Sequence, residues 1–200
     1  MTDSKELIAN GFFVITGGPG AGKTTLLQEL QKRFFTCIPE VAREIIKEQV
    51  VMQGDALPWK NKELYLQLMF NRSVDAYKAA NNNNNSLVFF DRGIPDSITY
   101  AKIIGFEKTE AMELDAKYYR YNQNVFFLSP WRDIYKIDDE RKQSWEEAVV
   151  SSELNAEMYR QFNYTLIDVP KDSPEKRADF ILAWIGGNAV CIPEDPAHQS

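Results

Sequence analysis

The sequence contains little of the residue types on which several classes of function depend. It has one histidine, His198, and two cysteines, Cys37 and Cys191, in 200 residues. His198 lies in a polar tail, where a residue is usually solvated and without a role, so histidine-based catalysis is nearly excluded. Because the two cysteines form no CxxC pair, a structural zinc site or a disulfide framework is not expected. A reducing, cytoplasmic setting fits this composition.

The chain also lacks an excess of positive charge and any long apolar run. Its formal net charge is -6, whereas a protein that binds nucleic acid needs clustered Lys and Arg. The N-terminal MTDSKELIAN is polar and contains no signal segment. No apolar run approaches the ~18 residues of a membrane span. We therefore expect neither nucleic acid nor a membrane as a partner.

The composition that remains is that of an ordinary globular domain. Hydrophobic residues make up 44% of the chain and charged residues 26%, and a chain of this length suits one domain. We predict a single domain over residues 1–187 and a loose tail over residues 188–200. The run Asn81–Asn85 is interpreted as an exposed loop tip.

Apolar, β-branched runs alternate along the chain with segments of helical periodicity. The predicted strands are FFVIT, FFTCIPE, SLVFFDRG, NVFFLSP and YTLIDVP. Predicted helices occupy residues 24–34, 41–50, 62–80, 94–105, 109–122, a segment starting with a capping box at Ser144 and Glu147, and 173–187. This alternation predicts an α/β fold with a parallel sheet covered by helices on both faces. The charged segment 131–143 is predicted to be mobile.

The stretch GGPGAGKT fits the phosphate-loop pattern G-x-x-x-x-G-K-[ST] without a mismatch. Gly17, Gly20 and Gly22 allow backbone N–H groups to curl around an anion, and a helix that opens near Lys23 adds its positive end. Lys23 can reach the β- and γ-phosphates, and the Thr24 hydroxyl can ligate Mg²⁺. A chance glycine-rich turn is the alternative, but the strand before the motif and the helix after it favour phosphate binding. The predicted nucleotide-binding residues are Gly17, Gly18, Pro19, Gly20, Ala21, Gly22, Lys23, Thr24 and Thr25.

A second candidate site residue is Asp91, which follows the apolar run LVFF. In an open α/β sheet, ligands bind at the carboxyl ends of the strands. An acid there can hold Mg²⁺ directly or through water. The alternative role for Asp91 is to cap the helix that begins in DRGIPDS.

Four segments resemble, in this order, a known family: GGPGAGKTTL, IPEVAREII, FFDRGIPDSITYA and YTLIDVP. They are similar to the predicted P-loop ATPase/kinase family related to the ribosylnicotinamide kinase domain of NadR, and more distantly to deoxynucleoside and thymidylate kinases. The resemblance covers roughly residues 12–184. It implies a five-stranded parallel sheet in the order 2-3-1-4-5, a nucleotide-kinase-like fold with a short lid, and ATP with Mg²⁺ as cofactors. GTP stays open as the nucleotide.

The resemblance also implies roles for an acid and an arginine. Glu40, in IPEVAR, matches the acid that accepts the proton of the substrate hydroxyl, and Arg92 matches an arginine near the transferred phosphate. Gly93 stands where nucleoside kinases have serine, which is a departure from their pattern. Glu40 is alternatively an exposed acid at a helix start, and Arg43 is a candidate partner for an ion pair near it.

The lid of these kinases carries several arginines after the fourth strand. Arg132, Arg141 and Lys142 are the basic residues in that region of this chain. The resemblance implies that Arg132 and Arg141 help to stabilise the transferred phosphate. The alternative is that all three belong to a solvated charged face.

Three functions are compatible with these motifs. The first is a kinase that transfers the γ-phosphate of ATP to an alcohol or phosphate acceptor, and the others are an NTPase switch and a nucleotide-binding regulatory module. The guanine-specificity element [NT]KxD is missing, because NKEL at residues 61–64 has leucine where the Asp belongs. Glu40 and the lid favour a kinase whose partners are a nucleotide and an unidentified small-molecule acceptor. A homodimer is left open.

Overall fold

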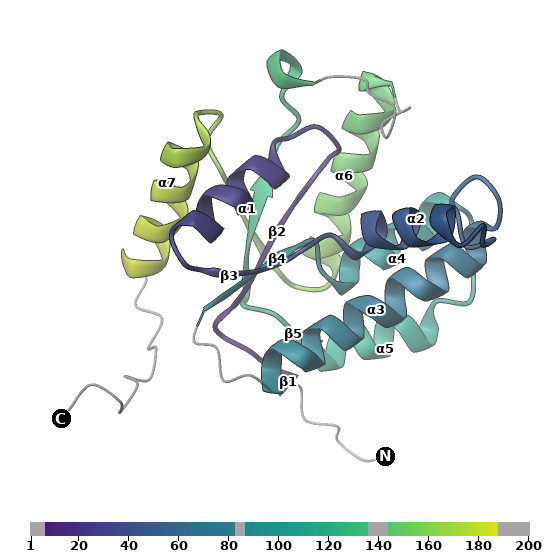
Figure 1. Cartoon of the computed structure of the whole chain (residues 1–200). Helices are drawn as coiled ribbons and strands as arrows, with labels where there is room; N and C mark the ends of the chain where they lie inside the picture. The colour runs from purple at the N-terminus through teal and green to yellow at the C-terminus, as the bar shows by residue number, and fades with distance from the viewer. Residues whose placement is uncertain (1–6, 83–86, 136–143, 188–200) are drawn as a thin grey trace.

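The computed structural model has a central parallel sheet with helices on both faces (Figure 1). It describes residues 7–82, 87–135 and 144–187. The strands of this sheet are β2 (Phe12–Gly17), β3 (Thr36–Ile38), β4 (Val88–Asp91), β6 (Asn124–Leu128) and β7 (Thr165–Asp168). They lie in the order β3-β4-β2-β6-β7, and every neighbouring pair is parallel. Counted along the chain this is the order 2-3-1-4-5, so the predicted α/β fold and sheet order are confirmed.

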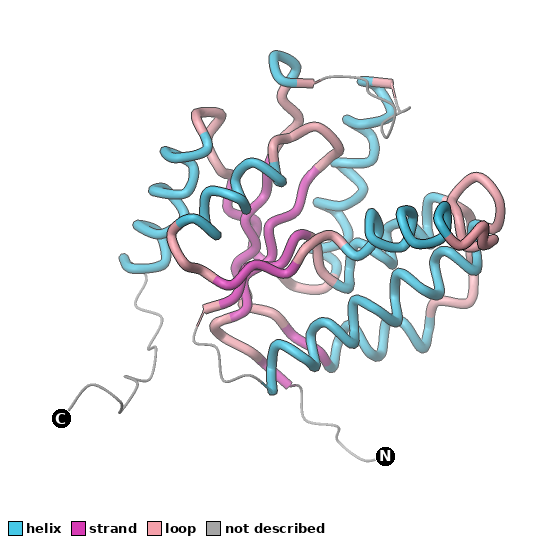
Figure 2. Tube along the Cα trace, in the orientation of Figure 1, coloured by secondary structure: helices cyan, strands magenta, loops and turns pink. Residues whose placement is uncertain are grey.

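The helices cover the sheet because side chains alternate across each strand. They are α1 (Lys23–Lys32), α2 (Val41–Val51), α3 (Lys62–Asn82), α4 (Ile94–Ile103), α5 (Glu110–Tyr118), α6 (Trp145–Gln161) and α7 (Pro174–Gly187). Phe13 and Ile15 of β2 face α1 and α7, whereas Phe12 and Val14 face α3, α4 and α6. Figure 2 shows the strands lying between these two helical layers. The central strand β2 is buried throughout, which explains its continuous apolar sequence.

Helix α2 is the exception, because it packs on other helices and not on the sheet. Ile45 of α2 is buried with Tyr65, Leu66 and Met69 of α3 and Ala101 of α4. The segment Pro39–Glu40 joins β3 directly to this outer helix. The start of α2 therefore lies at the carboxyl edge of the sheet, on the same side as the loop after β2.

The structure adds a small sheet that the sequence did not predict. Strands β1 (Leu7–Ile8) and β5 (Tyr119–Arg120) pair in parallel. The predicted helix over residues 109–122 consequently ends at Tyr118. The Tyr77 hydroxyl of α3 lies 2.9 Å from the Leu7 carbonyl oxygen and 2.8 Å from that of Arg120, so it ties this sheet to the core.

Several local expectations have mixed outcomes. The capping box is confirmed: Ser144 Oγ accepts from the Glu147 N–H at 3.1 Å, and the Glu147 carboxylate accepts from the Ser144 N–H at 2.7 Å. The loop tip at Asn81–Asn85 is wrong for its first two residues, because α3 continues through Asn82. Residues 83–85 lie outside the described chain.

Only the first part of the predicted mobile segment 131–143 is described by the structure. The short 3-10 helix η1 (Arg132–Ile134) occupies its described part, and residues 136–143 lie outside the described chain. The limits 1–187 and 188–200 stay predictions, since the structure describes nothing after Gly187. Among the described helices, none combines the length and the apolar character that a bilayer crossing requires.

We predict that Tyr77→Phe lowers the free energy of unfolding by about 1–2 kcal/mol, because the chain loses the hydroxyl that lies within hydrogen-bond distance of the Leu7 and Arg120 carbonyl oxygens. Urea unfolding of the full chain measures this loss. Tyr118→Phe is the matched control, since Tyr118 is exposed. Equal stability of the Tyr77 and Tyr118 variants would contradict the anchoring role of Tyr77.

Candidate functional site

The phosphate loop connects β2 to α1 and depends on its glycines. Gly17, Gly20 and Gly22 have φ angles of 140°, 75° and 82°, which L side chains rarely adopt. A Cβ at Gly17 would lie 2.2 Å from the carbonyl oxygen of Leu128 on β6. The motif therefore has its glycines where the backbone requires them, and the N-terminal end of α1 faces the loop as the phosphate-binding prediction demands.

Lys23, the first residue of α1, folds its side chain back over this loop. Its Nζ donates hydrogen bonds to the carbonyl oxygens of Gly17 at 3.0 Å and Gly18 at 2.9 Å. Burial, reinforced by the nearby Arg92, lowers the pKa of Lys23 to about 8, although the carboxylates of Asp91 and Glu40 oppose the shift. Lys23 thus keeps a positive charge at neutral pH inside the loop.

Asp91 lies at the carboxyl end of β4, beside Ile15 of β2. Its carboxyl group is buried, and Oδ1 has no hydrogen-bond partner among the described residues. Burial and the neighbouring Glu40 raise the pKa of Asp91 to about 6, against the attraction of Lys23 and Arg92. A buried carboxylate oxygen without a partner beside a phosphate loop fits a ligand of a divalent cation.

Acidic side chains alone could not complete the coordination shell of such a cation. Within the described ranges, no three His, Cys, Asp or Glu residues cluster closely enough to hold a metal ion. Mg²⁺ commonly takes one or two protein ligands and completes its shell with phosphates and water. Thr24, the other predicted metal ligand, is exposed at the start of α1. The donor set fits a nucleotide-bound Mg²⁺ and not a metal site built from protein alone.

Glu40 precedes α2 and is not the exposed helix-start acid of the alternative interpretation. Its Oε1 accepts from Arg92 Nε at 2.7 Å, and its Oε2 forms an ion pair with Arg43, 2.8 Å from Nε. Only 12% of the Glu40 side chain is exposed. Burial alone would raise the pKa of Glu40, but Arg92, Lys23 and Arg43 lower it to about 2. Glu40 is therefore a fixed carboxylate near the phosphate loop.

Arg92 joins this carboxylate to the phosphate loop. Its backbone has a φ of 72°, an uncommon value for a residue with a side chain. Its Nη1 donates to the Gly17 carbonyl oxygen at 3.2 Å and to Asp96 Oδ1 at 2.9 Å, while its Nε binds Glu40. The structure thus brings the predicted residues Lys23, Glu40 and Arg92 together at one edge of the sheet.

Asp96, on α4, is a site residue that the sequence analysis missed. Its carboxylate accepts from Thr16 Oγ1 at 2.8 Å, from Arg92 Nη1, from the Gly93 N–H at 2.9 Å and from the Tyr159 hydroxyl at 2.6 Å. The cap of α4, considered above for Asp91, is therefore made by Asp96. The spacing of Asp96 three residues after Gly93 carries a capping signal, but no local pattern indicates its contacts to β2 and α6.

The structure describes Arg132 alone among the three basic residues predicted for the lid. Arg132 is exposed, and its guanidinium lies over the Trp145 ring at 5.1 Å from the ring centre. Arg141 and Lys142 lie outside the described residues. Arg177 of α7, which the sequence analysis missed, is buried and donates from Nη1 to the Ala21 carbonyl oxygen at 3.1 Å.

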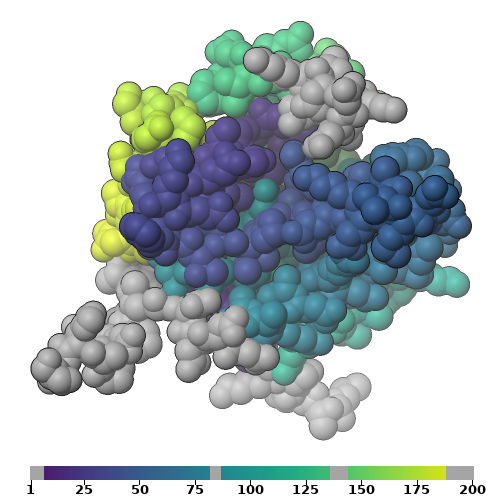
Figure 3. Space-filling view, in the orientation of Figure 1, coloured from purple at the N-terminus to yellow at the C-terminus, as the bar shows by residue number. Residues whose placement is uncertain are grey.

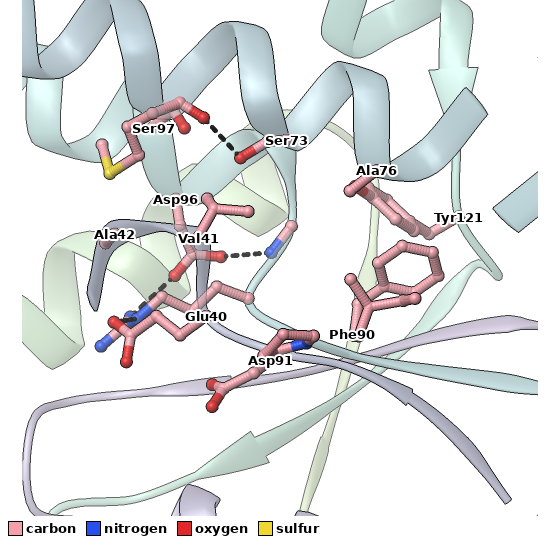
Figure 4. Close-up of a pocket in the computed structure, with 15 residues that line it drawn as sticks. Glu40, Val41, Ala42, Ser73, Ala76, Phe90, Asp91, Asp96, Ser97 and Tyr121 are labelled. Atoms are coloured by element: carbon pink, nitrogen blue, oxygen red, sulfur yellow. Dashed lines mark hydrogen bonds and ion pairs between the residues drawn. The ribbon is translucent and has the colours of Figure 1, made fainter. Parts of the chain in front are cut away.

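A pocket extends from the acidic cluster toward α3 and α4. Figure 4 shows the Glu40 and Asp91 side chains at one end and Phe90 and Tyr121 at the other. Its cavity volume of about 20 Å³ leaves room for about one water molecule. The segments that carry α1 and α2 lie on the same face of the molecule (Figure 3). This pocket is the candidate acceptor site beside the phosphate loop.

We predict that the Glu40 ion pairs contribute stability above pH 4.5 and lose it as the pH falls toward 2. The pKa of Glu40 is lower in the folded chain than its ordinary value of 4.5, so acid protonates the unfolded state first. The shift corresponds to on the order of 3 kcal/mol. Urea unfolding at several pH values measures the stability gap between the wild type and Glu40→Gln.

This gap should narrow as the pH falls below 4.5. Glu44→Gln is the control, because Glu44 is on the same helix but exposed, and it should show little gap at any pH. A gap for Glu40→Gln that stays constant from pH 6 to pH 3 would contradict the lowered pKa.

Comparisons with known proteins agree with this geometry. Residues 12–177 match the family described as AAA domain (AAA_28). No curated protein matches the chain. The solved structure "Crystal structure of NadR protein in complex with NR" is similar with a TM-score of 0.65 and 17% sequence identity, and the match covers 89% of this chain and 50% of that chain.

A second similar structure is that of shikimate kinase from Acinetobacter baumannii in complex with shikimate. Its TM-score is 0.55 at 16% sequence identity, over 90% of this chain and 95% of that chain. The chain thus has the fold of P-loop kinases, and it spans about half the length of the NadR structure. The resemblance predicted from the sequence is confirmed. Because the family match extends over most of the chain, we conclude that this protein belongs to the AAA domain family of P-loop proteins.

Proposed function

We propose that the chain is a kinase that transfers the γ-phosphate of ATP to a small molecule bound beside Glu40. One observation carries the proposal: the Arg92 side chain contacts both the Gly17 carbonyl oxygen of the phosphate loop and the Glu40 carboxylate at the pocket. Phosphoryl transfer depends mainly on aligning the acceptor with the γ-phosphate and on placing positive charge around it. Arg92 lies between the phosphate loop and Glu40, so its charge is close to both the γ-phosphate and the acceptor in this proposal.

The nucleotide side of the site would be formed by the phosphate loop. Backbone N–H groups at the start of α1 and the Lys23 ammonium bind the phosphates. Asp91 and Thr24 would hold Mg²⁺, which neutralises charge on the phosphates when bound. Asp91 contributes an unpartnered oxygen for this purpose. GTP is the second nucleotide to be compared with ATP.

The acceptor side would be formed by Glu40. Both of its carboxylate oxygens bind an arginine, but each retains lone pairs that can accept a hydroxyl hydrogen. With a pKa of about 2, Glu40 is a weak base, so its main contribution is to orient the acceptor hydroxyl. The proton then passes from the hydroxyl to Glu40 late in the transfer, when the new bond to phosphorus has acidified it.

The NTPase switch is the second candidate function. An enzyme that hydrolyses ATP needs no acceptor pocket, and the pocket lined by Glu40, Asp91 and Arg92 supports the kinase over the switch. The two solved structures named above are a NadR protein with bound NR and a kinase with bound shikimate. Their common fold supports a small-molecule acceptor for this chain as well.

We predict that Asp91→Asn weakens the dependence of nucleotide binding on Mg²⁺. The substitution replaces a carboxylate oxygen by a neutral amide, which is a poorer ligand for Mg²⁺. Calorimetry of ATP binding with and without Mg²⁺ measures the effect on the full chain. The metal-free affinity should change little, and an unchanged gain from Mg²⁺ would rule out the metal role of Asp91.

We predict that Glu40→Gln reduces γ-phosphate transfer by a factor on the order of 10²–10⁴ while hydrolysis by water changes much less. A panel of nucleosides, nucleotides and nicotinamide riboside with labelled ATP measures both rates. Glu44→Gln, on the exposed side of α2, should match the wild type. If Glu40→Gln removes hydrolysis and no member of the panel is phosphorylated, the switch function is correct instead.

A further inference from the structure

We propose that Arg177 of α7 is a ligand of the nucleotide and binds the phosphate group nearest the nucleoside. The inference rests on nucleotide binding, which is the part of the proposed function that the kinase and the NTPase switch share. It follows from the burial of the Arg177 side chain, from the lack of an acidic partner among the described residues, and from its position beside the start of α1.

The Arg177 side chain is a buried positive charge that no described carboxylate neutralises. Only 3% of the residue is exposed, and it takes part in none of the ion pairs between described residues. Its Nη1 donates to the Ala21 carbonyl oxygen at 3.1 Å, whereas its buried Nε has no hydrogen-bond partner in the described chain. Such a charge is strongly destabilising, so its presence points to an anion that binds there.

A second arginine at the contact between α1 and α7 shows the ordinary arrangement. Arg33, at the end of α1, forms ion pairs with Glu29 and with Asp179 of α7. Hydrogen bonds to Asp179 and Glu29 raise the pKa of Arg33, whereas burial lowers the pKa of Arg177. Helix α7 thus supplies an acid to Arg33 and none to Arg177, which lies only two residues before Asp179.

Arg177 lies at the end of the phosphate loop where α1 begins. A Cβ atom added to Gly22 would be 2.7 Å from Arg177 Nη1 and 3.7 Å from Thr25 Oγ1. The Thr25 side chain is exposed, and the first turn of a helix carries backbone N–H groups without partners in the helix. A phosphate at this turn would accept from these N–H groups, and it would supply the partner that Arg177 lacks.

The opposite end of the loop holds the phosphates that are farther from the nucleoside. The lysine of a phosphate loop binds the β- and γ-phosphates, and Lys23 Nζ lies 3.0 Å from the Gly17 carbonyl oxygen. One arginine joins this same carbonyl oxygen to Glu40, on the acceptor side of the proposed kinase. The nucleoside end of the polyphosphate therefore lies toward Gly22 and Arg177.

Trp131 covers Arg177 in this structure. The guanidinium carbon lies 5.9 Å from the centre of the Trp131 ring, a distance at which the ring attracts a cation. Because Arg177 is almost fully buried, a phosphate can reach it only when Trp131 gives up part of this contact. Charge-assisted hydrogen bonds to a phosphate are among the stronger interactions of arginine, so they can replace the contact with the ring.

Calorimetry of Mg-ATP and Mg-ADP binding to the full chain tests the inference. We expect Arg177→Met to weaken binding of both nucleotides by about 10- to 100-fold, the usual loss for a hydrogen bond to a charged group. The ratio of the two affinities should stay that of the wild type, since both nucleotides carry the phosphate in question. Lys176→Met, which removes an exposed cation from the same helix, should bind both like the wild type.

Urea unfolding of the nucleotide-free chain separates a ligand from a support of the loop. Removal of an unpaired buried charge relieves the fold, so we expect the Arg177→Met midpoint to lie above that of the wild type. A midpoint below the wild type would show that Arg177 supports the loop, and it would overturn the inference. Arg177→Lys keeps the charge and should bind Mg-ADP several times more tightly than Arg177→Met; equal affinities would also contradict the inference.

The outcomes separate this inference from the proposed function. Wild-type affinity for both nucleotides in Arg177→Met overturns the inference and leaves the kinase function intact. A loss that is confined to ATP places Arg177 at the γ-phosphate and overturns the inference as stated. Nucleotide binding that depends on Arg177, without transfer to any acceptor, supports the inference and overturns the kinase function. A wild-type chain that binds neither nucleotide overturns both.

Discussion

The buried carboxylate of Asp96 is the interaction on which the rest of the site depends. It accepts hydrogen bonds from Thr16, Arg92, Gly93 and Tyr159. A buried charge without partners costs several kcal/mol. Moving any of the four donors away from Asp96 would therefore destabilise the fold, which keeps the donors in place. They come from β2, from the turn after β4 and from α6. The buried Asp96 carboxylate thereby holds β2, the turn after β4 and α6 together at the edge of the sheet where the phosphate loop begins.

Arg92 transmits this constraint to the acceptor side. Held by Asp96 in an uncommon backbone conformation, it can contact Gly17 and Glu40 at the same time. Glu40 is in turn kept ionised by two arginines. The positive charges of the site are therefore divided: Lys23 stays with the phosphate loop, and Arg92 is neutralised at the pocket.

The sequence predicted the five-stranded sheet and the phosphate loop, but it did not predict Asp96 or the small β1–β5 sheet. The phosphate loop and the five strands follow from local rules, since glycine at positive φ and continuous apolar runs leave few other structures. Asp96 could not be found in this way, because its partners lie up to 80 residues away in the sequence. The small β1–β5 sheet was missed because two-residue strands carry no periodicity. The role of Arg132 at the transferred phosphate stays a prediction, and its guanidinium lies over the Trp145 ring in this structure.

The most direct test of the account is to measure whether the γ-phosphate is transferred to an acceptor or to water. ³¹P NMR of Mg-ATP with the full chain and the panel of nucleosides, nucleotides and nicotinamide riboside distinguishes transfer to an acceptor from release of inorganic phosphate. The account predicts that the γ-phosphate signal is replaced by that of a phosphate monoester coupled to the protons of the acceptor. Quantitative conversion of ATP to ADP and inorganic phosphate, with no ester formed from any member of the panel, would contradict it.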